Sequence, residues 1–343
     1  MTPLLTGRQI DNLLAQLKDK TILVVGDYFL DRYLIIDAAR DELSLETNLV
    51  AYQVVGQRIS PGAAGTITNN LRALGVGKVL ALGFTGDDGE GYELRRALKQ
   101  SGVDITHLLV DSRRVTPTYC KPMRKAGDEE KEINRLDIKN WTATPIELQE
   151  HLIENMFALA GSVDAVIVLD QVTEMDCGVV TQLMRSALGK LITTHPHLPI
   201  LVDSRRHINS FRSTIIKCNA AELMGSRTVA DRRAVQEAAL ALSAENKRPA
   251  FITMGEAGQL VAGDGVVQVV PAIPVAGPVD TVGAGDATMA GITCSLICGF
   301  TPEQAAFFGN LVASITIKKL GVTGTASPEE IRRQYAELCN LTG

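Results

Sequence analysis

Short apolar runs alternate with longer amphipathic segments along most of this chain, and this alternation constrains the fold more than any other feature. The apolar runs are residues 21–26, 79–86, 163–170, 199–204, 213–219 and 250–255. Helical periodicity predicts helices at residues 8–18, 65–74, 90–101, 145–160, 176–191 and 231–244. Strands and helices in alternation are typical of a doubly wound, mainly parallel α/β sheet with helices on both faces.

Polar residues directly follow several of the predicted strands. They are Asp27, Asp170, Asp203, Ser204 and Asn219. In doubly wound sheets, ligands bind outside the carboxyl ends of the strands. The sequence therefore predicts a ligand site at this edge of the sheet.

Two stretches, at about residues 33–58 and 113–137, interrupt the alternation. The first contains LVAYQVV, and the second reads as a hairpin around the polar turn KAGDEE, with no helix between their strands. We expect them to form a small β-sheet lid, inserted in a single domain that spans residues 1–343.

The charge of the chain limits its partners. The net charge is −5 at pH 7 and no basic stretch is long enough to suggest a polyanionic partner, so we expect no nucleic acid and no membrane among its partners. Residues 1–20 read as neither a signal peptide nor a membrane span. We therefore expect a small-molecule partner and a cytoplasmic location.

The segment from Asp280 to Asp286, DTVGAGD, leads directly into an apolar helix that we expect to begin near Gly283. The first turn of a helix presents unsatisfied N–H groups and the positive end of the helix dipole. Glycine lets a phosphate approach those groups closely. On this pattern alone, Asp286 is equally a base that takes a proton from a hydroxyl group or a carboxylate that caps the helix.

Other nucleotide-binding signatures are absent from the sequence. There is no GxxxxGK[ST] loop, no GxGxxG after the first strand, and no protein-kinase signature set.

Four segments resemble the ribokinase-like (PfkB) family of carbohydrate kinases. DTVGAGD resembles the C-terminal signature of the family and GAAGTITNNLRALG (62–75) the N-terminal one, while TMGEAG (253–258) and IIKCNAAEL (215–223) resemble segments beside the nucleotide. The resemblance extends along nearly the whole chain. ILVVGDYFLDRY (22–33) and INRLD (133–137) look most like the branch of the family that phosphorylates heptose 7-phosphates.

The chain departs from that branch where a sugar would bind. The segment 44–52 lacks the usual prolines, Gly62-Ala63 replaces a glycine pair, and Thr66 stands where the family usually has asparagine. The resemblance therefore indicates the reaction more sharply than the sugar.

The resemblance implies an ATP-dependent kinase that transfers the γ-phosphoryl group to a hydroxyl of a sugar or sugar phosphate, such as a heptose 7-phosphate. Asp286 would be the catalytic base. The backbone N–H groups of Gly283, Ala284 and Gly285 would form an anion hole for the transferring group.

The resemblance also implies the residues that bind each substrate. The sugar would contact Asp31, Asp27, Gly62, Ala63, Thr66 and Arg135. A phosphate on the sugar would need cations, for which the candidates are Lys121, Arg135, Arg32, Arg40 and Arg58.

The ATP site would include Ser204, Asn219, Glu222, Thr253, Gly255, Gly258 and Asn310. Mg²⁺ would meet Glu222 through water, because this ion keeps several of its own water ligands. Asp280 resembles part of the monovalent-cation loop of potassium-activated family members, so K⁺ is a candidate cofactor that the sequence leaves open.

Two other functions remain open from the sequence. One is a family kinase for another substrate, such as fructose 6-phosphate or a nucleoside. The other is a sugar- or nucleotide-binding regulator without catalysis, although such a protein has no need of Asp286. Since edge strands of a lid are exposed unless paired, we expect a homodimer formed through the lid.

Overall fold

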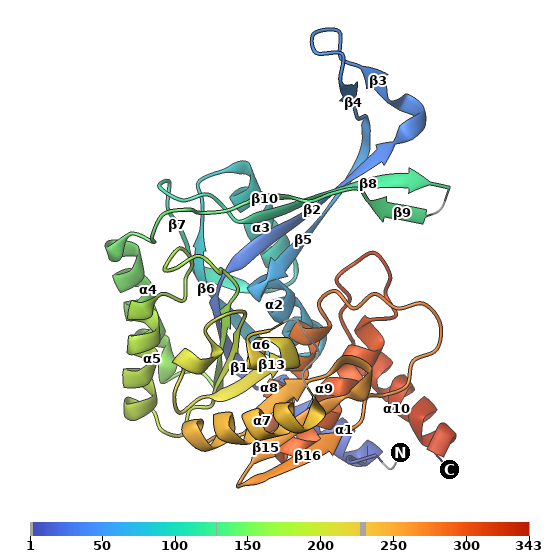
Figure 1. The fold of residues 1–343 in the computed structure, drawn as a ribbon. Helices are drawn as coiled ribbons and strands as arrows, with labels where there is room; N and C mark the ends of the chain where they lie inside the picture. The colour runs from blue at the N-terminus through green and yellow to red at the C-terminus, as the bar shows by residue number, and fades with distance from the viewer. Residues whose placement is uncertain (1–2, 128, 227–230, 343) are drawn as a thin grey trace.

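The computed structural model describes residues 3–127, 129–226 and 231–342. Asp128, in the turn of the predicted hairpin, and the outermost residues of the predicted 1–343 domain lie outside this part of the chain. A nine-stranded sheet forms the centre of the molecule (Figure 1), in the order β16-β15-β14-β13-β12-β11-β1-β6-β7. Its seven parallel strands are β1 (Thr21–Gly26), β6 (Lys78–Thr85), β7 (Asp104–Val110), β11 (Ala165–Asp170), β12 (Ile200–Ser204), β13 (Ile215–Asn219) and β14 (Ala250–Thr253).

The antiparallel strands β15 (Gln259–Gly263) and β16 (Val266–Val270) complete one edge of this sheet. The predicted parallel α/β sheet is confirmed. The sequence patterns missed β7, β15 and β16. These strands lie at the two edges of the sheet, where polar side chains interrupt the apolar runs.

Helices cover both faces of the sheet. Successive residues of a strand point to opposite faces, so the apolar strands present side chains that need to be buried on each face. Ile22 and Val24 of β1 belong to one apolar cluster, while Leu23 and Val25 belong to the other. The first cluster includes residues of α1 (Gly7–Leu17), α2 (Ala64–Ala73), α3 (Gly89–Gln100), α8 (Ala284–Ile297), α9 (Pro302–Thr316) and α10 (Pro328–Thr342). The second includes residues of α4 (Ile146–Ala160), α5 (Gln182–Thr194), α6 (Ala220–Met224) and α7 (Arg232–Asn246).

No described helix has the length and apolar character needed to cross a membrane.

Short 3₁₀ turns at η2 (Ile208–Ser210) and η3 (Gly255–Ala257) follow β12 and β14.

A second, smaller sheet projects from the main body (Figure 1), and we call it the lid sheet. It contains β2 (Tyr28–Asp37), β5 (Val54–Ala63), β8 (Thr118–Ala126), β9 (Glu129–Glu132) and β10 (Leu136–Ile138). Strands β2 and β5 extend beyond both ends of the predicted 33–58 segment. Strand β2 starts only two residues after the end of β1. The lid sheet is thereby joined directly to the carboxyl end of a central strand.

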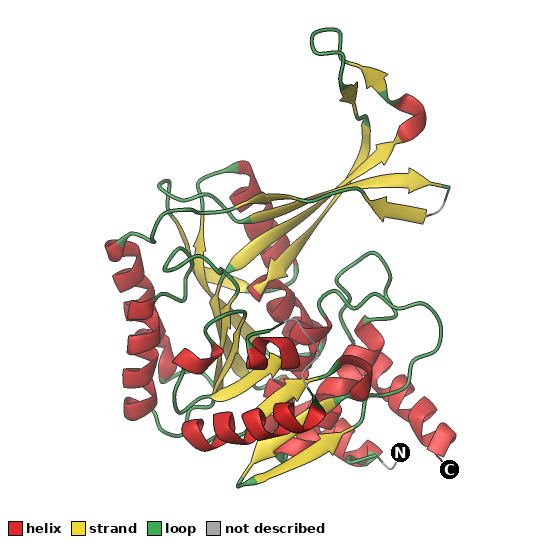
Figure 2. Cartoon of the chain, in the orientation of Figure 1, coloured by secondary structure: helices red, strands yellow, loops and turns green. Residues whose placement is uncertain are grey.

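Residues 38–52 extend beyond the lid sheet, and we call them the lid arm. The arm holds the turn η1 (Ala38–Arg40) and the paired strands β3 (Glu42–Leu43) and β4 (Val50–Ala51). Figure 2 shows it as a separate projection at the far end of β2 and β5.

Candidate active site

A cavity of about 540 Å³ lies between the carboxyl ends of the central strands, the lid sheet and the start of α8. Strand ends contribute Asp203, Lys217 and Asn219, and the lid sheet contributes Asp31 and Lys121. The glycine-rich segment contributes Gly283, Gly285 and Asp286. The cavity therefore joins residues from both ends of the sequence at the edge of the sheet that the strand pattern predicts.

Helix α8 begins immediately after Gly283, which has φ 79° and ψ 0°. Any other residue at this position would have a strained backbone at that φ, and its Cβ would lie 2.6 Å from Cγ2 of Thr323. Glycine is therefore required here for both backbone and space. Gly283 is the N-cap, so Asp286 lies in the first helical turn and is not the capping residue.

The first turn of α8 leaves backbone N–H groups available to a ligand. Ala284 N–H, one of the three predicted anion-hole donors, here donates to the carbonyl of Thr281 at 3.1 Å. Within the described residues, the N–H groups of Gly283 and Gly285 have no hydrogen-bond acceptor. Both residues line the cavity, so they are the better candidates to bind an anion.

The pKa of Asp286 is raised to about 7, chiefly because burial disfavours its charged form. Lys217 opposes this effect, and the negative charge of Asp203 adds to it. A carboxyl group with a pKa near neutral pH is well matched to general-base catalysis. This arrangement favours the base over the capping carboxylate.

Lys217 and Asp203 form a buried ion pair in the cavity wall, with 2.6 Å between Nζ and Oδ2. The strand pattern predicts Asp203 only as a residue at a strand end, and no motif indicates Lys217. The available signal was a charged residue inside the apolar strand IIKCN. Tyr119, Gln171 and Thr323 are further cavity residues that the motifs did not indicate.

Asn219 and Glu222 both line the cavity at the start of α6 and form a reciprocal capping box. The Asn219 side chain accepts from the N–H of Glu222, and the Glu222 carboxylate accepts from the N–H of Asn219, each at 2.8 Å. Burial and the nearby charge of Asp203 raise the pKa of Glu222. A bound cation would relieve this repulsion.

The described residues hold no group of three or more His, Cys, Asp or Glu side chains that would enclose a metal ion. Glu222 lies at the cavity wall beside Asp203, which is itself paired with Lys217. This set fits Mg²⁺ held mostly by water and by substrate phosphates, and it does not fit a metal enclosed by protein ligands.

One carboxylate oxygen of Asp31 makes an ion pair but no hydrogen bond within the described residues. This Oδ1 atom is buried, and its ion-pair partner, Lys121 Nζ, lies 3.3 Å away. Both side chains line the cavity. Buried polar atoms are normally hydrogen-bonded, so a ligand hydroxyl would complete this site.

The N-terminal signature lies beside Asp31. A Cβ at Gly62 would lie 2.8 Å from Asp31 Oδ2, so glycine leaves room for that carboxylate. Ala63 has φ 51° and ψ −121°, a conformation that residues other than glycine rarely adopt. Thr66 is buried in the cavity wall, and its hydroxyl donates to the carbonyl of Pro61 at 3.3 Å.

Asp27 does not reach the cavity, contrary to the prediction that it binds the sugar. Its buried carboxylate accepts hydrogen bonds from the backbone N–H groups of Gln171, Val172 and Val179 at 2.7–2.9 Å. These bonds tie the loop between β11 and α5 to the end of β1, so we assign Asp27 a structural role.

Several predicted nucleotide-binding residues also have other contacts. The buried hydroxyl of Ser204 donates to Asp170 at 2.7 Å, and the Asn310 side chain pairs with Gln259 and with backbone carbonyls. Neither residue lines the cavity, whereas Thr253 does.

Gly255 and Gly258 form the tight turn η3 after β14, with φ 57° and 85°. A Cβ at Gly258 would lie 2.2 Å from the carbonyl oxygen of Val270. Both glycines are explained by this turn, which lies next to Thr253.

Asp280 fixes the loop before α8. Its carboxylate accepts from the N–H groups of Val282 at 3.0 Å and of Gly321 at 3.1 Å. Both carboxylate oxygens of Asp280 are thus engaged by backbone N–H groups.

The arginines predicted to bind a sugar phosphate are all engaged with carboxylates. The pairs are Arg32 with Glu90 and Glu93, Arg40 with Asp37, Arg58 with Glu130, and Arg135 with Asp137. Arg135 also lies 4.1 Å over the ring of Tyr119, next to the cavity. Of these predicted cations, only Lys121 lines the cavity itself.

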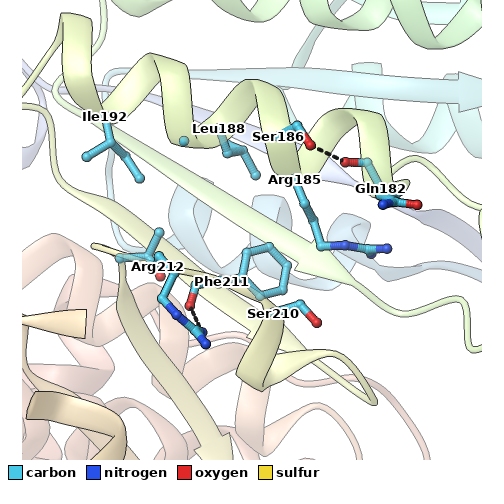
Figure 3. Close-up of a pocket in the computed structure, with 10 residues that line it drawn as sticks. Gln182, Arg185, Ser186, Leu188, Ile192, Ser210, Phe211 and Arg212 are labelled. Carbon is cyan, nitrogen blue, oxygen red and sulfur yellow. Dashed lines mark hydrogen bonds between the residues drawn. The ribbon is translucent and has the colours of Figure 1, made fainter. Parts of the chain in front are cut away.

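A second hollow of about 470 Å³ lies between α5 and residues 210–214 (Figure 3). Arg185 on its wall donates to the carbonyl of Val180 at 2.8 Å, and the side chain of Arg212 donates to its own neighbouring carbonyls. No carboxylate is among its described lining residues. It therefore lacks the acid–base groups found in the first cavity.

A comparison with protein families matches residues 22–330 to the family described as pfkB family carbohydrate kinase. The bifunctional protein HldE of Citrifermentans bemidjiense is 30% identical over 332 residues, which cover 94% of this chain and 65% of that protein. HldE of Geotalea uraniireducens is 29% identical over 333 residues, or 94% of this chain and 64% of that protein. The chain thus spans slightly less than two thirds of the length of these relatives.

Solved structures with the same fold include Arabidopsis thaliana ribokinase complexed with ribose and ATP. That structure has a TM-score of 0.67 and 16% identity, covering 92% of this chain and 98% of the ribokinase. Phosphofructokinase-2 from Escherichia coli, in complex with substrates and products, has a TM-score of 0.70 and 18% identity over 93% of this chain and 99% of the enzyme. At these identities the likeness establishes the fold.

Proposed function

This chain belongs to the pfkB family of carbohydrate kinases, and we propose that it transfers the γ-phosphoryl group of ATP to a hydroxyl group of a sugar or sugar phosphate. The observation that carries the proposal is Asp286, a carboxyl group with a pKa of about 7 in the first turn of α8. Asp31, with a carboxylate oxygen that accepts no hydrogen bond from the described residues, lines the same cavity.

In the proposed reaction, Asp31 accepts hydrogen bonds from sugar hydroxyls and orients the acceptor. Asp286 takes the proton from the attacking hydroxyl. The N–H groups of Gly283 and Gly285 stabilise the negative charge on the transferring group, and a fixed donor of this kind contributes about 3 kcal/mol.

The chain's own residues would also hold the metal that accompanies ATP. Bound Mg²⁺ would neutralise charge on the phosphates. Glu222 would hold it, mainly through its water ligands, and Asn219 would keep Glu222 in place through their capping box. A monovalent cation such as K⁺ would sit near the loop that Asp280 fixes.

We propose a phosphorylated sugar as the acceptor, with a heptose 7-phosphate as the first compound to test. Lys121 supports an anionic acceptor because its ammonium group lies in the cavity wall beside Asp31. The heptose is suggested by the segments 22–33 and 133–137 and is consistent with the similarity to HldE proteins. ATP and sugar phosphates are cytoplasmic compounds, so this function would place the chain in the cytoplasm.

ADP release with ATP and Mg²⁺, measured over a panel of sugars and sugar phosphates, tests the function. The panel should include heptose 7-phosphates, fructose 6-phosphate, neutral sugars and nucleosides. We expect saturable turnover with a phosphorylated sugar. Retained nucleotide binding with no ADP release over the whole panel would instead indicate a regulator without catalysis.

We further propose that two copies of the chain associate through their lids. The lid arm exposes Leu43, Leu45, Leu49, Val50 and Tyr52, with exposed fractions between 48% and 103%. Contiguous exposed apolar side chains on a projecting element are typical of an interface. Pairing two arms would remove this surface from water.

A further inference from the structure

Lys217 is a buried charged residue that has no role in the reaction proposed above. It lies on β13 between Ile216 and Cys218, whose side chains belong to the apolar cluster under α5 and α7. The Lys217 side chain points to the opposite face, toward the cavity, and the residue is 5% exposed. Burial of an ammonium group is costly unless it is paired, so its position needs an explanation.

The ammonium group lies against the first turn of α8. A Cβ at Gly285 would lie 2.9 Å from Lys217 Nζ. The glycine therefore gives the ammonium group access to the helix backbone beside the proposed anion hole. Lys217 also interacts electrostatically with Asp286 and lowers its pKa.

Asp203 holds the lysine in this position. Its Oδ2 atom accepts a hydrogen bond from Nζ at 2.6 Å. Burial alone would lower the pKa of Lys217, but attraction to Asp203 and the neighbouring carboxylates outweighs it and the pKa is raised. The lysine therefore remains charged at neutral pH.

The ammonium group keeps unused hydrogen-bonding capacity. It has three N–H donors, and Asp203 is its only hydrogen-bond acceptor in the described part of the chain. A purely structural ion pair would not need to face the cavity. The remaining donors are available to an anion that enters beside α8.

We propose that Lys217 is a catalytic residue whose ammonium group donates hydrogen bonds to the non-bridging oxygens of the transferring phosphoryl group, with Asp203 as its positioning residue. This inference rests on the proposed kinase function. In the step, the acceptor oxygen forms a bond to the γ-phosphorus and the bond from that phosphorus to the β–γ bridging oxygen breaks. ADP leaves with the electron pair, Asp286 takes the hydroxyl proton, and Lys217 keeps its protons.

Lys217→Met tests the proposal, because methionine has a similar length and no charge. We expect kcat to fall by about 100- to 1000-fold, as for the loss of one fixed donor to the transition state. Binding should separate two ligands: the Kd of ADP–Mg²⁺ should stay within about threefold, while the Kd of ADP–Mg²⁺ with aluminium fluoride should rise by at least about 30-fold. Aluminium fluoride mimics the transferring group, so this ratio isolates the contact with it.

The control is Lys190→Met on the exposed surface of α5, for which neither Kd should change. Equal weakening of both ligands by Lys217→Met, or a kcat within about fivefold of the unmodified protein, would overturn the proposal. Since an unpaired Asp203 can destabilise the fold, Asp203→Asn and Asp203→Asn/Lys217→Met are compared for the same ratio of the two Kd values. The ratio of the Kd with aluminium fluoride to the Kd without it should be higher in the double variant than in Asp203→Asn. The two variants would have equal ratios if the lysine only paired Asp203.

Failure of the kinase function itself gives a different result. An unmodified protein that binds neither ADP nor ADP with aluminium fluoride, and that phosphorylates nothing, refutes that function. An active unmodified protein with an unaffected Lys217→Met variant refutes only the role of the lysine.

Discussion

The ammonium nitrogen of Lys121 lies 3.3 Å from Oδ1 of Asp31 in the wall of the cavity. The two residues come from neighbouring parallel strands, β8 and β2, and both are less than a tenth exposed. Burial raises the pKa of Asp31, and Lys121 only partly opposes this effect. One pair thus presents an acceptor for a hydroxyl and a donor for an anion within the same few ångströms.

Lys121→Met should distinguish phosphorylated from neutral acceptors. A charge-assisted hydrogen bond contributes about 1.5–3 kcal/mol, so KM for a sugar phosphate should rise by about 10- to 100-fold. KM for a neutral sugar should change much less, and KM for ATP should not change. Steady-state kinetics with each acceptor measures this.

Arg135→Gln is the comparison for this variant, because Arg135 is already engaged with Asp137. Its effect on KM should be no more than about threefold, as for a partly exposed ion pair. A larger effect from Arg135→Gln than from Lys121→Met would contradict our assignment of the anion-binding cation.

Asp286→Asn should lower kcat by about 10²- to 10⁴-fold, the usual contribution of a general base. ATP should still bind with nearly unchanged Kd, since the asparagine keeps the shape of the helix start. Kinetics and calorimetry on the same preparation test both statements. Asp264→Asn, in the exposed turn between β15 and β16, is the control, and near-normal turnover in Asp286→Asn would exclude the base role.

The pH dependence of kcat/KM should show an acid limb with a midpoint near pH 7. The pKa of Asp286 is raised to about 7, chiefly because loss of contact with water disfavours its charged form. A base must be ionised to accept a proton, so activity is lost as pH falls through this pKa and is recovered as pH rises above it. Rates measured from pH 5.5 to 8.5 check the sign, and a flat profile across this range would contradict it.

Gly62→Ala should impair acceptor binding without affecting ATP. The added Cβ would lie 2.8 Å from Asp31 Oδ2 and would displace that carboxylate. Overpacking of this kind costs about 1–3 kcal/mol, so KM for the acceptor should rise by about 5- to 150-fold. Gly56→Ala, in the same strand with 3.8 Å to its nearest neighbour, is the matched control; equal effects in both variants would show that Asp31 is not the cause.

Leu45→Ser/Leu49→Ser should convert the proposed dimer into a monomer. The two side chains are 103% and 69% exposed in the single chain, so their replacement should change the free energy of unfolding of the monomer by no more than about 0.5 kcal/mol each. Light scattering over a range of concentrations measures the association. Met175→Ser, 77% exposed in a loop outside the lid, should leave it unchanged, and a double variant that stays dimeric would place the interface elsewhere.

Much of the fold was predictable because buried parallel strands appear in the sequence as continuous apolar runs. All six residues of β11 are buried, and the run 163–170 predicted this strand directly. Strand β7 was missed because Asp104, Thr106 and His107 interrupt its apolar pattern.

The site was predictable where a local motif requires it and unpredictable where it depends on strand order. Asp286 and Gly283 lie in one segment whose backbone demands glycine. The Lys217–Asp203 pair depends on β12 and β13 being neighbours. Asp27 was misjudged because its donors lie about 150 positions away, for example 152 for Val179.

Ala63 affects both the stability of the chain and the size of the acceptor site. Its φ of 51° is costly for any residue with a Cβ, by about 1–3 kcal/mol, and its methyl group belongs to the cavity wall. Replacement by glycine would relax the backbone and enlarge the acceptor site in a single step. A substitution at this single position therefore changes the stability of the chain and the size of its acceptor site together.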